Sequence, residues 1–138
     1  MYEVVIAENK KEMLDHFFIR GEVFMVEQAI DWEEEFDGAD YTATLFVLYK
    51  GGTPIGAARL KENSVGRVAV LKSERKNHAG TRLMNAVEKE AKRQGIKTLK
   101  LGAQKHVIPF YESLGYSSYG DIFLDALIEH KMMKKDIL

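Results

Sequence analysis

The segment 68–94 constrains the fold more than any other part of the chain. It starts with a short apolar run, Val68–Leu71, and continues through a basic loop into a long run with helical spacing. Apolar residues of that run share one helical face and polar residues fall elsewhere: Leu83, Met84, Val87 and Ala91 against Asn85, Glu88, Lys89, Lys92 and Arg93. Gly95 follows, where a helix commonly ends. The pattern predicts a strand, a loop and a helix, in this order.

The loop before the predicted helix is basic, with Glu74 as its only acidic residue. Its cationic residues are Lys72, Arg75, Lys76 and Arg82. The first turn of a helix exposes unpaired N–H groups at the positive end of the helix dipole, so this loop favours a phosphate or pyrophosphate. Gly80 lets a ligand approach the backbone closely. Neither a P-loop nor a G-x-G-x-x-G fingerprint is present, and a solvated loop before a surface helix is the alternative interpretation.

Length, charge and cysteine content exclude several classes of protein. A chain of 138 residues predicts a single domain over 1–138. Twenty basic and 21 acidic residues give a net charge of −1, which argues against a general nucleic-acid binder. The absence of cysteine excludes disulfides, thiolate metal sites and a cysteine nucleophile. No signal peptide and no apolar stretch of about 20 residues is visible, so we expect a cytoplasmic protein without membrane association.

The remaining sequence reads as strands and helices around this central unit. We expect strands and helices at Tyr2–Ile6 (strand), Glu8–Val23 (helix), Ala43–Tyr49, Pro54–Lys61, Arg67–Leu71 and Thr98–Ala103 (strands), Val107–Leu114 (helix), and Tyr116–Phe123 and Glu129–Lys134 (strands). Gly51-Gly52 predicts a hairpin turn. The helix between Val68 and Thr98 makes their two strands parallel. The predicted fold class is α+β, with one central mixed sheet of about six or seven mostly antiparallel strands.

Two short motifs give the chain a family resemblance. Arg75–Gly80 resembles the Q/R-x-x-G-x-G/A motif of the GCN5-related N-acetyltransferase (GNAT) family, and Phe110–Tyr116 is similar to its F-Y-E-x-x-G-F segment. Val23–Gln28 and the acidic stretch after it resemble one small bacterial subgroup, the ElaA- or YjcF-like acetyltransferases. The resemblance covers nearly the whole chain in the expected order. One departure is His78, which stands where the family usually has its first glycine.

The resemblance implies an acetyl-CoA site and its residues. It implies helices on both faces of the sheet and a V-shaped gap between the Val68 and Thr98 strands, in which acetyl-CoA lies as co-substrate. The pantetheine amides would pair with Val68, Ala69 and Val70, and the Val70 N–H would stabilise the oxyanion. The pyrophosphate would sit on the turn formed by Arg75, Lys76, Asn77, His78, Ala79, Gly80, Thr81 and Arg82. Gln104, at the position of the family's usual asparagine, would hold the pantetheine or the acceptor, and Phe110 would complete the cofactor site.

Acetyl transfer to an amine needs a group that protonates the departing thiolate and a base that removes a proton from the amine. Tyr111 matches the family tyrosine and is the candidate proton donor; its alternative role is aromatic packing beside Phe110. Glu27, His106 and His130 are the candidate bases, and the sequence does not choose among them. No His, Asp or Glu cluster has metal-ligand spacing, so we expect no metal.

The segment 27–40 contains seven acidic residues and no lysine or arginine. It is either a solvated segment or the entrance for a cationic acceptor, beside which Trp32 could stack. The function expected is therefore an enzyme: an N-acetyltransferase that moves an acetyl group from acetyl-CoA to a primary amine by direct attack in a ternary complex. We expect the acceptor to be a small-molecule or protein amine, and the chain to be a monomer or a homodimer. The alternatives are a non-catalytic CoA-binding or sensing module of the same fold and a plain phosphate or nucleotide binder.

Overall fold

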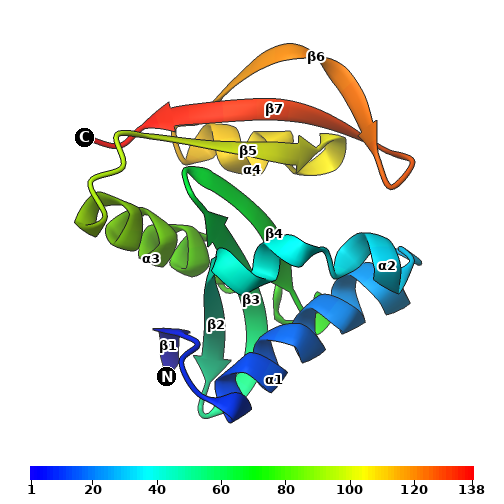
Figure 1. Cartoon of the computed structure of the whole chain (residues 1–138), viewed down its shortest axis with the longest axis vertical. Coiled ribbons are helices and arrows are strands. Elements are labelled where there is room, and N and C mark those ends of the chain that lie inside the picture. Colours follow the sequence, from blue (N-terminus) through cyan, green and yellow to red (C-terminus); the bar gives the residue numbers. More distant parts are fainter.

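Four consecutive antiparallel strands form one half of a seven-stranded sheet in the computed structural model, which describes residues 1–138 (Figure 1). They are β1 (Tyr2–Ile6), β2 (Thr44–Lys50), β3 (Thr53–Lys61) and β4 (Ser64–Val70). The predicted Gly51-Gly52 turn joins β2 and β3, and both glycines have positive φ. The expectation that the third strand begins at Arg67 is wrong, because Glu62 adopts a φ of 54° and closes a two-residue turn directly before Ser64.

The helix α3 (Ala79–Arg93) connects β4 to the second half of the sheet. That half contains β5 (Thr98–Gln104), β6 (Ser117–Asp125) and β7 (Ile128–Asp136), and the strand order is β1-β2-β3-β4-β5-β7-β6. β5 runs parallel to β4, as a crossover helix requires, and all other neighbours are antiparallel. The predicted mixed, mostly antiparallel sheet is thus confirmed.

β4 and β5 diverge after two residue pairs. Only Ser64 and Val65 pair with β5. Beyond them β4 carries a bulge, in which Arg67 and Val68 lie opposite the single residue Ala58 and Arg67 adopts a φ of 52°. A bulge bends its strand and increases the local twist, which turns the rest of β4 away from β5. The predicted V-shaped gap between these strands is therefore confirmed, and the bulge is its structural cause.

Helices cover both faces of the sheet. Successive side chains of each strand point to opposite faces, so each strand can contact helices on both sides. Leu45 and Val47 of β2 lie on the same side as α1 (Lys10–Arg20) and the π-helix η1 (Gly21–Glu27) that continues it. On the other face, α3 buries the four apolar residues predicted for it against Phe46 and Leu48. The helical segment therefore runs on through Val26 to Glu27, beyond the expected end at Val23.

The remaining elements are short. They are α2 (Trp32–Glu35), η2 (Gly38–Thr42), η3 (Lys72–Glu74), η4 (Lys105–Val107) and α4 (Ile108–Ser113). Pro109 lies in the first turn of α4, and Gly115, with a φ of 97°, follows its end. No helix is both long enough and apolar enough to span a bilayer.

Candidate active site

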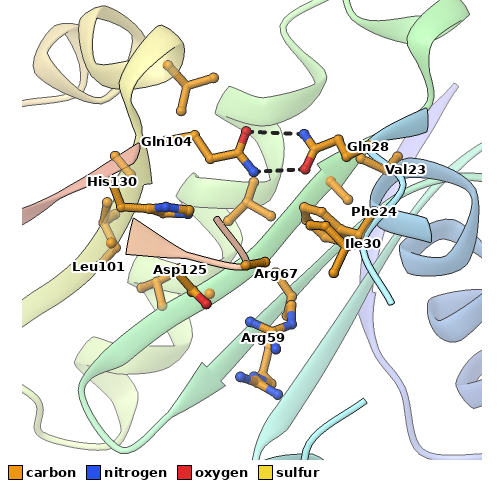
Figure 2. A pocket seen from close by; sticks show the side chains of 18 of the residues that line it. Val23, Phe24, Gln28, Ile30, Arg59, Arg67, Leu101, Gln104, Asp125 and His130 are labelled. Carbon is orange, nitrogen blue, oxygen red and sulfur yellow. Dashed lines mark hydrogen bonds between the residues drawn. The ribbon is translucent and has the colours of Figure 1, made fainter. Parts of the chain in front are cut away.

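A pocket of about 630 Å³ opens where β4 and β5 separate (Figure 2). Its walls come from η1, β4, β5, α4 and the end of β6. Figure 2 shows His130 on one side of the pocket, Phe24 on the other, and Gln28 and Gln104 reaching toward one another between them. The pocket therefore gathers residues that lie up to about a hundred positions apart in the sequence.

The wall formed by β4 offers backbone groups to the gap. The Leu71 N–H donates to the Ile55 carbonyl of β3 at 2.9 Å. Because peptide groups alternate in direction along a strand, the N–H and C=O of Val70 face the opposite way, toward the gap. Val68, Ala69 and Val70 all line the pocket, as the sequence predicts. The gap thus leaves these peptide groups of β4 without a partner in β5, although the Val70 carbonyl accepts a hydrogen bond from Arg75.

The loop at the start of α3 contributes only part of its predicted residues to the pocket. Arg75 and Gly80 line it. The other predicted residues do not: Lys76, Asn77 and His78 are exposed outside it, Ala79 is buried in the core, Thr81 is half-buried, and the Arg82 guanidinium lies 4.2 Å from the centre of the Tyr2 ring. Ala79, Gly80 and Thr81 still form the first turn of α3, whose backbone N–H groups have no partner within the helix.

His78 and Gly80 have specific backbone reasons for their positions. His78 has a φ of 56°, a left-handed conformation that glycine adopts at no steric cost, which explains why a glycine suits this position. Its side chain does not narrow the pocket. A Cβ on Gly80 would lie 2.9 Å from the Phe110 ring, so the absence of a side chain also lets α4 pack against α3.

The Arg75 guanidinium forms hydrogen bonds with other residues of the protein. Its Nε–H donates to the Val70 carbonyl at 2.9 Å, and its Nη1 donates to Glu27 Oε2 at 2.8 Å, with a second bond from Nη2 to the same carboxylate. The hydrogen bonds from Arg75 hold the pKa of Glu27 below its usual value. Glu27 is thereby a weaker base than a free carboxylate.

Tyr111 lines the pocket, and its hydroxyl has no hydrogen-bond partner in the protein. The side chain is 7% exposed, packs edge-to-face on Phe110 and Tyr116, and its hydroxyl makes no hydrogen bond within the protein. Burial raises the pKa of Tyr111 above its usual range, so the phenol keeps its proton at neutral pH. An unpartnered, protonated hydroxyl is suited to donating a hydrogen bond to a ligand.

His130 stands on β7 directly opposite Gln104 of β5 and stacks on Phe123. Its Nδ1 lies 2.7 Å from the Ile128 carbonyl, which can only accept, so we assign the proton to Nδ1. Nε2 then carries a free lone pair. His106, the third candidate base, also lines the pocket but is exposed on η4.

Gln104 and Gln28 form a reciprocal pair across the pocket. Gln104 Nε2 donates to Gln28 Oε1 at 2.8 Å, and Gln28 Nε2 donates to Gln104 Oε1 at 3.1 Å (Figure 2). Gln104 is among the residues predicted for the site, but Gln28 is not. The sequence signals of Gln28 were its place directly after Glu27 and its position in the segment Val23–Gln28, which resembles the acetyltransferase subgroup.

Arginines of the protein pair with part of the acidic segment, whose role as a solvated segment or as an entrance stays open. Arg20, Arg59 and Arg67 neutralise three of its carboxylates, Glu35, Asp37 and Asp40. Arg20 and Glu35 are 0% and 2% exposed. Burial raises the pKa of Glu35, whereas hydrogen bonds from Arg20 and Arg59 outweigh the burial of Asp40 and lower its pKa. Of the residues that line the pocket, Glu34 keeps its carboxylate unpaired.

Residues 5–137 match the family model described as the acetyltransferase (GNAT) domain. The chain belongs to the GNAT acetyltransferase family. The uncharacterized N-acetyltransferase YjcF of Bacillus subtilis is 38% identical to this GNAT chain over 139 residues, which cover 97% of this chain and 99% of YjcF. The crystal structure of Escherichia coli ElaA matches with a TM-score of 0.86 at 25% identity and covers 99% of both chains.

The GNAT fold extends to more distant structures. An aminoglycoside 6′-N-acetyltransferase complexed with coenzyme A has a TM-score of 0.75 to this chain at 18% identity, over 99% of this chain and 97% of that one. At this identity the match shows a shared fold. The predicted family resemblance, including its ElaA- or YjcF-like subgroup, is confirmed.

Proposed function

We propose that residues 1–138 act as one N-acetyltransferase domain, which moves an acetyl group from acetyl-CoA to a primary amine by direct attack in a ternary complex. The observation that carries this proposal is the gap between β4 and β5, where the Val70 peptide group and the unpartnered Tyr111 hydroxyl face the same pocket. The family and the coenzyme A complex of an aminoglycoside acetyltransferase of the same fold support it.

The residues of the gap fit the parts of acetyl-CoA. The pantetheine amides would pair with the peptide groups of Val68 and Val70, since these face away from β3. The N–H groups of the first turn of α3, with Arg75 and Lys76 nearby, would hold the pyrophosphate. Gln104 and Phe110 would lie beside the pantetheine arm.

Each chemical step has a candidate group. The amine nitrogen attacks the thioester carbonyl carbon, the Val70 N–H donates to the oxyanion, and the C–S bond then breaks. Tyr111 donates its proton to the departing thiolate. We propose His130 Nε2 as the group that takes the amine proton, because its lone pair is free while Glu27 is paired with Arg75.

Calorimetric titration with acetyl-CoA, CoA and 3′,5′-ADP tests the cofactor site, and thiol release with a panel of amines tests transfer. We expect acetyl-CoA to bind clearly more tightly than 3′,5′-ADP, because the pantetheine arm adds contacts with β4. Equal affinities would contradict pantetheine binding in the gap. Tight acetyl-CoA binding without thiol release for any amine would favour a non-catalytic CoA-binding module.

A further inference from the structure

The Arg75 side chain lies in the part of the pocket in which the proposed function places the cofactor. All three nitrogen atoms of the Arg75 guanidinium are engaged, Nε with the Val70 carbonyl and both Nη atoms with the Glu27 carboxylate. Arg75 follows β4, yet its side chain turns back along the end of that strand and lines the pocket. Although the side chain is partly exposed, its guanidinium is bound to Val70 and Glu27 and is not free to reach a phosphate.

The carbonyl that Arg75 occupies is one that the proposed function assigns to the cofactor. Val70 directs its peptide group toward the gap, because the neighbouring Leu71 N–H bonds to β3. The guanidinium lies in hydrogen-bond contact with this carbonyl at 2.9 Å. A pantetheine amide that pairs with Val70 therefore needs the space that Arg75 now fills.

Glu27 holds Arg75 in this position from the other side of the pocket. It is the last residue of η1, 48 positions before Arg75. The next residue, Gln28, bonds to Gln104 of β5. The end of η1 thus contacts both walls of the gap.

We propose that Glu27 and Arg75 form a latch that incoming acetyl-CoA opens. In the open state Arg75 exchanges the Glu27 carboxylate for pyrophosphate oxygens, and the Val70 carbonyl becomes free for the pantetheine arm. This inference rests on the proposed function. Both side chains of the latch are partly exposed, 39% for Arg75 and 33% for Glu27, so the ion pair is weak and screened by salt. The latch therefore lowers cofactor affinity a few-fold and does not abolish binding.

A double-mutant cycle on acetyl-CoA affinity, measured by calorimetry, tests the latch. Glu27→Gln keeps the size of the side chain but removes its charge, and we expect acetyl-CoA to bind about two- to fivefold more tightly, the range set by an exposed ion pair. Arg75→Gln should bind more weakly, because a pyrophosphate contact is lost. In the Arg75→Gln background, Glu27→Gln should add nothing, because no latch remains to release.

Glu34→Gln is the matched control, since Glu34 is an exposed carboxylate that lines the same pocket without an ion pair. If Glu34→Gln gives the same gain, or if the gain of Glu27→Gln persists without Arg75, the effect is general charge repulsion and the latch is overturned. Equal affinity of wild type and Glu27→Gln overturns the latch alone. Absence of acetyl-CoA binding in both proteins overturns the proposed function and the latch with it.

Discussion

His78 is a residue whose backbone conformation conflicts with its side chain. Its φ of 56° lies in the left-handed region, which costs an ordinary residue about 1–2 kcal/mol. Glycine removes this cost but loses about 0.4–1 kcal/mol through its greater freedom in the unfolded chain. We expect His78→Gly to raise the free energy of unfolding by about 0.5 kcal/mol.

Chemical denaturation of His78→Gly checks this, with Asn77→Gly as the control. Asn77 is an exposed neighbour without positive φ, so glycine there should destabilise the protein. Acetyl-CoA affinity should stay unchanged in His78→Gly, because the imidazole does not line the pocket. A marked gain in affinity would instead show that His78 restricts the cofactor site.

Tyr111 and Tyr116 are both buried, and a comparison of their phenylalanine variants distinguishes a catalytic role from a packing role. The Tyr111 hydroxyl has no partner within the protein, whereas the Tyr116 hydroxyl donates to Glu88 at 3.2 Å. Tyr111→Phe should therefore lower kcat about 100-fold, the lower range for loss of a general acid, with little change in Tm. Tyr116→Phe should lower Tm slightly and leave kcat unchanged. Steady-state thiol release and thermal unfolding of both variants make the comparison, and equal kcat in Tyr111→Phe and wild type would remove the proposed role.

At the scale of elements, ion pairs attach α2 and η2 to α1 and the sheet. Glu35 at the end of α2 accepts from Arg20 Nε at 2.5 Å and pairs with Arg67 Nε at 3.0 Å, both inside the protein. Removing one partner of a buried pair leaves an uncompensated charge, which costs about 3–5 kcal/mol.

Glu35→Gln should therefore destabilise the protein by about 3 kcal/mol. Glu34→Gln, one residue earlier and exposed, should change stability by less than about 0.5 kcal/mol. Urea denaturation of the two variants tests this contrast. Similar small effects would mean that Asp40 and Asp37, which already pair with Arg20 and Arg67, compensate the two arginines without Glu35.

Elements with strong local signals could be predicted from the sequence, and elements with unusual turns could not. The periodicity of α3 and the Gly51-Gly52 turn were sufficient to locate both. The turn between β6 and β7 uses Ala126 and Leu127, both with positive φ, and neither residue is typical of such a turn. The bulge at Arg67 gave no signal either, because tertiary pairing with β3 and β5 imposes it.

The whole molecule brings together charges that are distant in the sequence. The basic turn and Tyr111 were recognisable from local motifs, but the partners of the acidic segment were not. Arg20, Arg59 and Arg67 lie in a helix and two strands, and only the packing of α1 against β3 and β4 places them beside Glu35, Asp37 and Asp40. An acidic run in a sequence therefore shows the charge of a segment but not the field of the folded protein.

The same network makes stability depend on pH through His16. His16 is 0% exposed; its Nδ1 lies 2.9 Å from the Phe46 carbonyl and its Nε2 lies 3.2 Å from Arg20 Nη1. Burial, reinforced by the charges of Arg20 and Arg59 and opposed by the Phe46 bond and by Asp40, lowers the pKa of His16 from 6.5 to about 4. Between these two values the unfolded chain binds a proton that the folded chain does not, so stability falls as the pH falls.

The expected loss from this one group is about 2 kcal/mol between pH 7 and pH 5, and it nears about 3 kcal/mol below pH 4. Glu35 acts in the opposite sense, because its pKa is raised in the folded protein, so the histidine contribution must be isolated by difference. His16→Gln can keep both hydrogen bonds but has no proton to gain. Urea unfolding of wild type and His16→Gln at pH 7, 6 and 5 should give a wild-type curve that falls more steeply by this amount. Parallel curves would mean that His16 has the same pKa in the folded and unfolded chains, because Asp40 compensates its charge beside Arg20.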